Sequence, residues 1–337
     1  MAVRPLVDRF GRVHTDLRVS LIDKCDLRCR YCMPAEGLPW LSKASLLTDG
    51  EVVRAVGLAV RELGITSIRL TGGEPLLRRG LVDIVRALAA LRPRPALAMT
   101  SNGVGLARLA GPLAGAGLDR VNVSLDTLRR DRFHHLTRRD RLDEVLAGLA
   151  AAAAAGLHPM KVNVVVQRGV NDDEVVDLAE FCVEHGYQVR FLEQMPLDAQ
   201  RDWTPDAVVG AAEVLDRLAA RWSLTPVPGR GSAPAETYLL DGVRAADGGP
   251  ATVGVVAPVS RPFCGSCNRL RLTADGQLRA CLFATAETDL RGALRHGASD
   301  AKLAELWLAA VAGKGAGHRI AEPDFEQPER PMAAIGG

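Results

Sequence analysis

The chain has 337 residues, which is enough to bury the core of one large domain or of two smaller ones, and 47% of them are hydrophobic and 24% charged. The formal net charge of +2 argues against a protein that coats nucleic acid. Met1–Arg12 lacks the apolar core of a secretory signal, and the apolar stretch Leu149–Leu157 is too short to span a bilayer. We therefore expect a cytoplasmic protein with reduced thiols and with no nucleic-acid or membrane partner.

Short β-branched runs alternate with amphipathic helical patterns over the first two thirds of the chain. The predicted strands are Leu17–Ile22, Ser67–Thr71, Ala96–Ser101, Arg120–Leu125, Met160–Gln167 and Gln188–Glu193. The predicted helices are Thr48–Leu63, which opens with a capping pattern of Thr48 and Glu51, Leu81–Leu91, Leu142–Ala155 and Asp173–His185. Strands separated by helices form parallel, right-handed βαβ units. The pattern predicts an α/β fold, either a doubly wound sheet or a barrel.

The last third of the chain has a different organisation. A stretch rich in Pro and Gly, Thr225–Pro234, is predicted to be a linker. We expect residues 1–224 to form the barrel-type domain and residues 225–337 a small appended domain, whose tail is irregular. The elements predicted in the appended domain are short strands near Glu236–Leu240, Thr252–Val256, Leu270–Thr273 and Leu278–Leu282, and a helix over Ser299–Ala312.

Six of the seven cysteines fall into two triads, one near each end of the chain. They are Cys25, Cys29 and Cys32, and then Cys264, Cys267 and Cys281. Each triad is one thiolate short of a closed tetrahedral site, which leaves a coordination position for a substrate. We predict two open 4Fe-4S clusters. Zinc sites completed by histidine are the alternative, but no histidine lies at zinc-finger spacing beside either triad. The odd cysteine count argues against disulfides, and Cys182 is expected in the core.

Further unusual motifs occur where predicted strands end. Thr71–Pro75 follows the second strand, Thr100–Gly103 the third, Ser124–Asp126 the fourth and Glu193–Pro196 the sixth, and the first triad begins three residues after Ile22. Active sites of barrels lie at the carboxyl ends of their strands. In the motif Thr71–Pro75, the two glycines allow a ligand to approach the backbone, and the glutamate can accept a hydrogen bond from an ammonium group. Five strands are therefore predicted to direct their chemistry to one face.

Two of these motifs carry a resemblance to known families. The spacing of Cys25, Cys29 and Cys32, followed by Gly72-Gly73-Glu74-Pro75, is similar to that of the radical S-adenosylmethionine (SAM) superfamily. The run 260–283, which holds the second triad, closely resembles the C-terminal signature of the GTP 3′,8-cyclase family of molybdenum cofactor biosynthesis. The resemblance extends from residue 18 to residue 337 and is weak over 198–235. It implies a partial (β/α)6 TIM-type barrel with a C-terminal iron–sulfur cluster domain.

The resemblance also implies a lyase reaction and its partners. An external electron donor would reduce the first cluster, which would cleave SAM to methionine and a 5′-deoxyadenosyl radical. That radical would remove the 3′ hydrogen of GTP, and attack on C8 would give (8S)-3′,8-cyclo-7,8-dihydroguanosine 5′-triphosphate, the first step of molybdopterin biosynthesis. The second cluster would bind the guanine. A homodimer and delivery to a downstream cyclic pyranopterin monophosphate synthase are family expectations; the sequence leaves the electron donor, the oligomeric state and the donor of the final proton open.

Single positions match the family pattern. The resemblance implies that SAM is bound by Tyr31, Gly73, Glu74, Ser124 and Met195. It implies that GTP is bound by Arg18, Arg69, Thr100, Lys161, Arg269 and Arg271, of which Arg18, Arg269 and Arg271 are also candidates for supporting the final reduction. Guanidinium groups suit phosphate because they donate in pairs and keep their charge. The terminal Gly336-Gly337 is expected to reach into the active site, where bulkier residues would not fit.

Two other functions stay open. A peptide-modifying radical SAM enzyme would use the second site for electrons, although such relatives usually carry further cysteines and only Cys182 is left over. A zinc-stabilised protein could instead bind nucleic acid through its arginines, with a steep salt dependence. Each arginine taken alone is consistent with a solvated surface charge, and Lys161 with a lysine on a strand edge.

Overall fold

The computed structural model describes residues 3–246, 248–322 and 324–336, so Gly337 of the predicted tail lies outside the described residues. Its strands form one twelve-stranded sheet in the order β12-β11-β10-β1-β2-β3-β4-β5-β6-β9-β8-β7. The six central strands run parallel and are adjacent in chain order. They are β1 (Asp16–Ser20), β2 (Ser67–Thr71), β3 (Ala96–Ser101), β4 (Arg120–Ser124), β5 (Lys161–Val166) and β6 (Gln188–Glu193).

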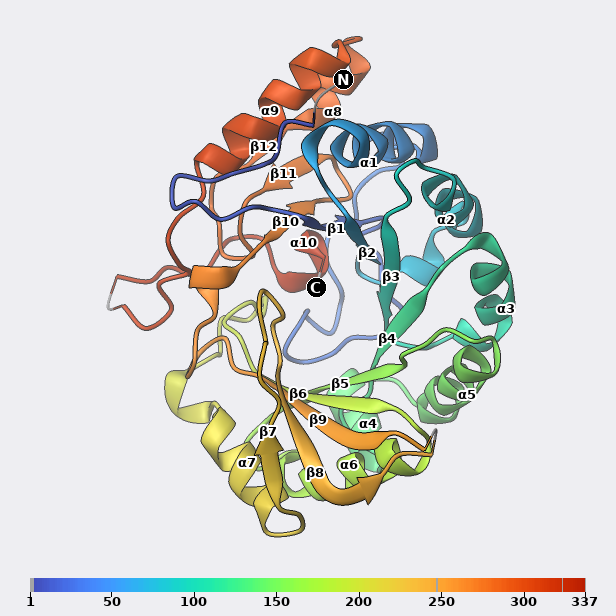
Figure 1. The fold of residues 1–337 in the computed structure, drawn as a ribbon, viewed down its shortest axis with the longest axis vertical. Helices are drawn as coiled ribbons and strands as arrows, with labels where there is room; N and C mark the ends of the chain where they lie inside the picture. The colour runs from blue at the N-terminus through green and yellow to red at the C-terminus, as the bar shows by residue number, and fades with distance from the viewer. Residues whose placement is uncertain (1–2, 247, 323, 337) are drawn as a thin grey trace.

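These strands curve into an incomplete barrel with helices on its outer face (Figure 1). The helices that connect them are α1 (Asp49–Leu63), α2 (Leu81–Ala89), α3 (Leu106–Ala116), α4 (Arg130–Thr137), α5 (Leu142–Ala154) and α6 (Val175–Glu184), with short 3-10 turns at η1 (Pro75–Leu77) and η2 (Asp172–Glu174). The partial TIM-type barrel is thereby confirmed, and all six predicted strands are present within two residues of their predicted ends.

Alternation of side chains explains how a strand can serve both the core and the interior of the barrel. On β5, Val162, Val164 and Val166 are buried in the hydrophobic core, while Asn163 and Val165 line a cavity inside the barrel. Successive side chains of a strand point to opposite faces of the sheet. Asn163 and Val165, which alternate with the buried valines, are therefore directed inward.

The predicted start of α1 is confirmed in detail. Thr48 Oγ1 accepts from the backbone N–H of Glu51, and the Glu51 carboxylate accepts from the backbone N–H of Thr48. Gly64 ends the helix with a φ of +79°, a conformation that favours glycine. The predicted helices were present, but α3 and α4 were missed: α3 contains Gly111, Pro112 and Gly115, which lower helix propensity.

The C-terminal third extends both edges of the barrel sheet. β10 (Arg269–Leu272) pairs in parallel with β1, and β9 (Pro250–Val256) pairs in parallel with β6. Outward from these lie β7 (Leu224–Pro226) with β8 (Glu236–Arg244), and β11 (Gln277–Arg279) with β12 (Thr288–Asp289), all antiparallel. Two residues of the predicted linker, Thr225 and Pro226, thus belong to a strand. The division of the chain after residue 224 stays a prediction.

The remaining short elements also lie in this part of the chain or just before it. They are η3 (Pro205–Ala207), α7 (Ala211–Ala219), η4 (Cys264–Ser266), α8 (Leu290–Arg295), α9 (Asp300–Ala312) and α10 (Met332–Ile335). The tail, predicted to be irregular, therefore includes one short helix, and Figure 1 shows α10 inside the curve of the barrel. None of the helices in the described ranges combines the length and the apolar character needed to cross a membrane.

Candidate active site

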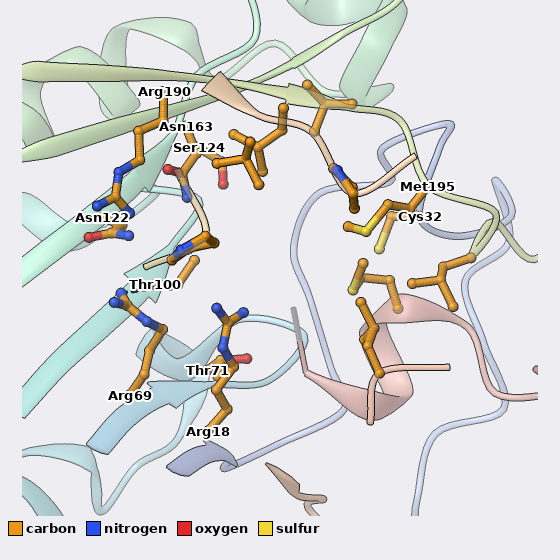
Figure 2. Close-up of a pocket in the computed structure, with 18 of the residues that line it drawn as sticks. Arg18, Cys32, Arg69, Thr71, Thr100, Asn122, Ser124, Asn163, Arg190 and Met195 are labelled. Atoms are coloured by element: carbon orange, nitrogen blue, oxygen red, sulfur yellow. Dashed lines mark hydrogen bonds between the residues drawn. The ribbon is translucent and has the colours of Figure 1, made fainter. Parts of the chain in front are cut away.

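A cavity of about 770 Å³ lies inside the barrel, and all six cysteines of the two triads line it. Each of the six central strands contributes side chains to its wall, and so does β10. Figure 2 shows Arg18, Arg69 and Arg190 on one side of this cavity, opposite Cys32 and Met195. The structure therefore brings the two triads, which are far apart in sequence, to one cavity with a strongly basic wall.

The sheet register places three predicted arginines side by side. Arg18 on β1 lies directly between Arg69 on β2 and Arg271 on β10. Neighbouring strands are about 4.8 Å apart, so the three guanidinium groups are close neighbours. Further along the sheet, Arg190 on β6 lies opposite Asn163 on β5 in the strand register, and both line the cavity. The basic wall of the cavity is thus built from groups on several strands.

Burial and mutual repulsion disfavour the charged state of these groups. Burial, together with the charge of Arg18, lowers the pKa of Arg69 to about 9 and that of Arg190 to about 10. Burial and the charge of Arg190 lower the pKa of Lys161 to about 7. The pKa of Arg18 is also lowered, by burial first, and its buried Nε has no hydrogen-bond partner among the described residues. Such a cluster fits a ligand that carries several negative charges.

Most of the predicted site residues come together at this cavity. Those that line it are Tyr31, Gly73, Ser124 and Met195 of the predicted SAM set, and Arg18, Arg69, Thr100, Arg269 and Arg271 of the predicted GTP set. Two do not belong to the lining. Lys161 is half-buried at the start of β5, opposite Asn122 of β4. Glu74 is fully buried behind Gly73.

Glu74 links the ends of two strands rather than facing the cavity. Its carboxylate accepts from Ser101 Oγ at 2.9 Å, from the backbone N–H of Asn102 at 2.6 Å and from that of Leu76 at 3.0 Å. Burial raises its pKa to about 8, although these hydrogen bonds act in the opposite direction. Glu74 therefore fixes the loop after β3 against the glycine motif, and its predicted contact with SAM stays a prediction.

The glycine pair before Glu74 allows the first cysteine loop to pack tightly. A Cβ atom on Gly73 would lie 2.3 Å from the carbonyl oxygen of Asp23 and 2.4 Å from that of Lys24. A Cβ atom on Gly72 would lie 2.4 Å from the carbonyl oxygen of Ile22. Any side chain at these positions would displace the segment that leads into Cys25.

The first triad provides a donor set that fits an iron–sulfur cluster. Burial raises the pKa of Cys25 and Cys29 far above the usual thiol value, and that of Cys32 to about 11. Thiols in such surroundings become ligating thiolates when a metal supplies positive charge. Among the described residues, no group of three or more His, Cys, Asp or Glu side chains is arranged to hold a single metal ion. A 4Fe-4S cluster takes each thiolate on a different iron.

The second triad lies in a more electropositive environment. Burial would raise the pKa of Cys267, but the charges of Arg269 and Lys314 and hydrogen bonds from Arg269 lower it to about 7. Burial raises the pKa of Cys264. Each of the seven cysteines is a free thiol, and Cys182 is buried on α6 as predicted. Three partly exposed thiols beside cationic groups also form a donor set that fits a cluster.

Arg269 is held by part of the predicted linker Thr225–Pro234, which the sequence did not connect with the site. Its guanidinium group lies 4.8 Å from the ring centroid of Phe263, and that of Arg230 lies 4.9 Å from the same centroid. Arg269 also donates to the carbonyl oxygen of Ser232 at 3.3 Å. Residues 230–234 line the cavity. Cation–π contacts from two arginines thus fix this loop next to the second triad.

The chain end approaches the same arginine row. The carbonyl oxygen of Gly336 accepts a hydrogen bond from Arg271. A Cβ atom on Gly336, whose φ is +90°, would lie 2.9 Å from Ser20 Cβ and from Thr71 Oγ1. The described part of the tail therefore lies against the cavity wall, where only a residue without a side chain fits.

Sequence reasoning missed several lining residues. Arg190 and Asn163 were not selected because a single inward position of a strand carries no motif. Asp126 was noted only as part of a strand end, yet it accepts from Tyr31 Oη at 2.7 Å and from the backbone N–H of Val165 at 2.8 Å. Burial raises its pKa to about 6. The signal that could have found Arg190 and Asn163 is a polar residue at an alternate position of an apolar strand.

Comparisons with known proteins agree with this geometry. A family model described as the radical SAM superfamily matches residues 19–182, and one described as Molybdenum Cofactor Synthesis C matches residues 187–320. The GTP 3′,8-cyclase of Streptomyces coelicolor is 59% identical over 98% of this chain and 96% of its own length. That of Mycobacterium marinum is 57% identical over 99% of this chain and 92% of its own length.

Solved structures show the same fold at low sequence identity. Streptococcus suis SuiB bound to S-adenosylmethionine has a TM-score of 0.58 at 13% identity, covering 83% of this chain and 64% of its own. The structure of native anSMEcpe with bound AdoMet has a TM-score of 0.55 at 15% identity, covering 81% of this chain and 77% of its own.

Proposed function

The chain belongs to the GTP 3′,8-cyclase family of the radical SAM superfamily, and from this membership we infer that it converts GTP to (8S)-3′,8-cyclo-7,8-dihydroguanosine 5′-triphosphate, the first step of molybdenum cofactor biosynthesis. The observation that supports this best is one cavity lined both by two cysteine triads and by a cluster of arginines. A cavity of about 770 Å³ is within the size range of pockets that bind small ligands.

The end of the cavity near the first triad is the proposed SAM site. A 4Fe-4S cluster on Cys25, Cys29 and Cys32 would supply the electron that cleaves SAM to methionine and a 5′-deoxyadenosyl radical. The residues proposed to hold SAM are Tyr31, Gly73, Glu74, Ser124 and Met195. The hydrogen bond that Tyr31 donates to Asp126 orients the phenol ring, and Gly73 lets a ligand contact the backbone because it has no side chain. These residues exclude water and fix the nucleoside next to the substrate.

The basic wall is the proposed triphosphate site. Arg18 and Arg69, together with Thr100 and Lys161, would neutralise and orient the phosphates, and Arg190 extends the same wall. Each guanidinium group can donate two parallel hydrogen bonds to phosphate oxygens. The bound anion would favour the charged forms of groups that burial and mutual repulsion disfavour in the free protein.

The second triad is proposed to hold a second 4Fe-4S cluster, whose open iron binds the guanine. Arg269 and Arg271 lie beside this triad in the register of β10 and β1, so they can contact a guanosine that spans the cavity. Together with Arg18 they are the proposed supports of the final reduction. We also propose a cytoplasmic homodimer that receives its electron from an external donor and delivers its product to a cyclic pyranopterin monophosphate synthase.

Anaerobic reconstitution tests this proposal. Protein with both triads intact should be brown and contain about eight iron and eight sulfide per chain by the two-cluster count. With dithionite, SAM and GTP it should lose GTP and form 5′-deoxyadenosine together. Formation of 5′-deoxyadenosine without loss of GTP would instead indicate a peptide-modifying enzyme, and a colourless, zinc-containing protein would contradict both.

A further inference from the structure

A buried lysine, Lys314, lies behind the second triad and is only 3% exposed. Its Nζ lies 2.7 Å from the carbonyl oxygen of Arg269, 3.4 Å from Nδ1 of His14 and 3.6 Å from Sγ of Cys267. An ammonium group has three N–H donors and no acceptor. The three neighbours therefore supply one acceptor for each donor, and one of these acceptors is a cysteine sulfur of the triad.

The N-terminal segment holds this lysine in place. His14 is fully buried, and its Nε2 lies 3.0 Å from Oδ2 of Asp8. An ionised carboxylate can only accept, so Nε2 of His14 carries the proton and Nδ1 is left as an acceptor that faces Lys314. Asp8 is kept ionised by an ion pair with Arg12 at 2.6 Å and by the backbone N–H groups of Phe10 and Arg12.

Arg12 connects the same segment to the second triad a second time. Its guanidinium group donates to the carbonyl oxygens of Cys264 at 2.7 Å, Gly315 at 2.6 Å and Ala316 at 2.9 Å. Three parts of the chain, 8–14, 264–269 and 314–316, are thus tied together on the side of the triad that faces away from the cavity. Neither Arg12, His14 nor Lys314 lines the cavity, so this network lies outside the proposed SAM and GTP sites.

We propose that Lys314 is a positioning residue of the second cluster, whose ammonium group donates a hydrogen bond to the Cys267 sulfur and makes the cluster easier to reduce. The inference rests on the proposed function, because it requires a cluster on Cys264, Cys267 and Cys281. Hydrogen bonds and positive charge at a ligating sulfur stabilise the reduced, more negative state of a cluster. The side-chain hydrogen bonds between Asp8 and His14 and between His14 and Lys314 direct the ammonium group towards that sulfur.

The test uses full-length protein in which Cys25, Cys29 and Cys32 are changed to alanine, so that only the second cluster is present. Lys314→Met removes the charge and the donors while keeping the length of the side chain. The matched control is Lys302→Met on α9, an exposed lysine paired with Glu305. A potentiometric titration followed by electron paramagnetic resonance (EPR) measures the reduction potential of each protein.

Lys314→Met should lower the ratio of reduced to oxidised cluster at a given potential about tenfold, which is a shift of about 59 mV for one electron. Lys314→Arg should restore most of the shift, and Lys302→Met should leave the potential unchanged. Equal potentials in the parent and in Lys314→Met would overturn the inference.

A loss of iron is also informative once circular dichroism has shown that the apo-protein is folded. If Lys314→Met does not retain the cluster, Lys314→Gln and Lys314→Arg are compared. If Lys314→Arg retains the cluster and Lys314→Gln does not, the result supports a role for the charge. If both variants retain the cluster equally, or both lose it equally, the inference is overturned. A parent protein without iron would instead show that the proposed second cluster is wrong.

Discussion

Three arginines, Arg18, Arg69 and Arg271, occupy adjacent positions on neighbouring strands and face one cavity. Like charges at opposed positions destabilise a sheet, and burying a charge without a partner costs free energy. The row of arginines therefore lowers the free energy of unfolding of the ligand-free protein, and a bound polyanionic ligand would offset that cost. Each basic residue of the wall should therefore destabilise the ligand-free protein and strengthen the binding of an anionic ligand.

The substitution Arg190→Ala tests both effects at a residue that belongs to no sequence motif. The variant should bind GTP about 10- to 100-fold more weakly, because hydrogen bonds to charged groups contribute about 1.5–3 kcal/mol. The free energy of unfolding of the free protein should stay the same or rise, because one source of repulsion is removed. Isothermal titration calorimetry and chemical denaturation measure the two quantities. Arg86→Ala on α2, an exposed arginine paired with Asp83, is the control and should change neither.

The lowered pKa of Lys161 predicts that GTP binding is coupled to protonation of this side chain. Its pKa is lowered from 10.5 to about 7, so near pH 7.5 the group is mostly neutral in the free protein. A bound triphosphate favours the ammonium form, and GTP binding should therefore take up a proton, with affinity falling as the pH rises above 7. Calorimetry in two buffers of different ionisation enthalpy measures this uptake. Lys161→Met should abolish it, and Lys302→Met should not.

The same lowered pKa fixes the sign of the effect on stability. Between about pH 7 and 10.5 the unfolded chain binds a proton at Lys161 that the folded chain does not. Stability of the free protein should therefore rise with pH across this window, by at most about 1.4 kcal/mol per pH unit from this group. A Lys161→Met protein whose unfolding free energy has the same pH dependence as the parent would contradict this assignment.

At the scale of elements, the end of β2 and the first cysteine loop are built as one unit. The loop from β1 to α1 passes over Gly72 and Gly73, and the hydrogen bonds of Glu74 tie the end of β2 to the loop after β3. The geometry of the first triad thus depends on strands that contribute none of its thiols.

Gly73→Ala should disturb the first triad selectively. The added Cβ atom would lie 2.3 Å from a backbone oxygen, so the loop before Cys25 must shift. We expect about half of the iron to be lost in reconstituted protein, about four per chain, because the nearest atoms to the added Cβ belong to Asp23 and Lys24, which lead into the first triad. Gly265→Ala is the matched control within the second triad, where a Cβ atom would meet nothing within 4 Å. Full iron content in Gly73→Ala would refute the packing argument.

Several elements could be predicted from sequence because local patterns determine them. The strands β2, β3 and β6 have the predicted bounds, and Thr48 caps α1 as expected. Helix α3 was missed because its glycines and proline obscure a buried face made of two leucines and two alanines. Helix α4 was missed because only Phe133, Leu136 and Thr137 of its eight residues are buried. Tertiary packing stabilises both helices against weak intrinsic propensity.

At the scale of the whole molecule, the two ends of the chain complete one sheet. β10 pairs with β1 and β9 with β6, so both edges of the six-stranded barrel are covered by the C-terminal third. Local sequence patterns contain no record of such long-range pairing. The cysteines and the motif arginines could therefore be predicted, but the alignment of Arg18 with Arg271, the inward position of Arg190 and the contact of Lys314 with the second triad could not.

This pairing predicts how a shortened chain behaves. Residues 1–224 alone would leave β1 and β6 as open edges with unpaired backbone groups, and open edges promote aggregation. We expect this fragment to aggregate, whereas the full chain stays in solution, as measured by size-exclusion chromatography with light scattering. A fragment that is monomeric and unfolds in one cooperative transition would instead favour an independent barrel domain.

The central claim is that one cavity brings a nucleotide to the second triad. It is tested most directly by EPR spectra of reduced, oxygen-free protein in which Cys25, Cys29 and Cys32 are alanine, recorded with and without GTP. The account predicts about four iron per chain and a spectrum that changes when GTP is added. A spectrum that stays the same at saturating GTP would contradict it.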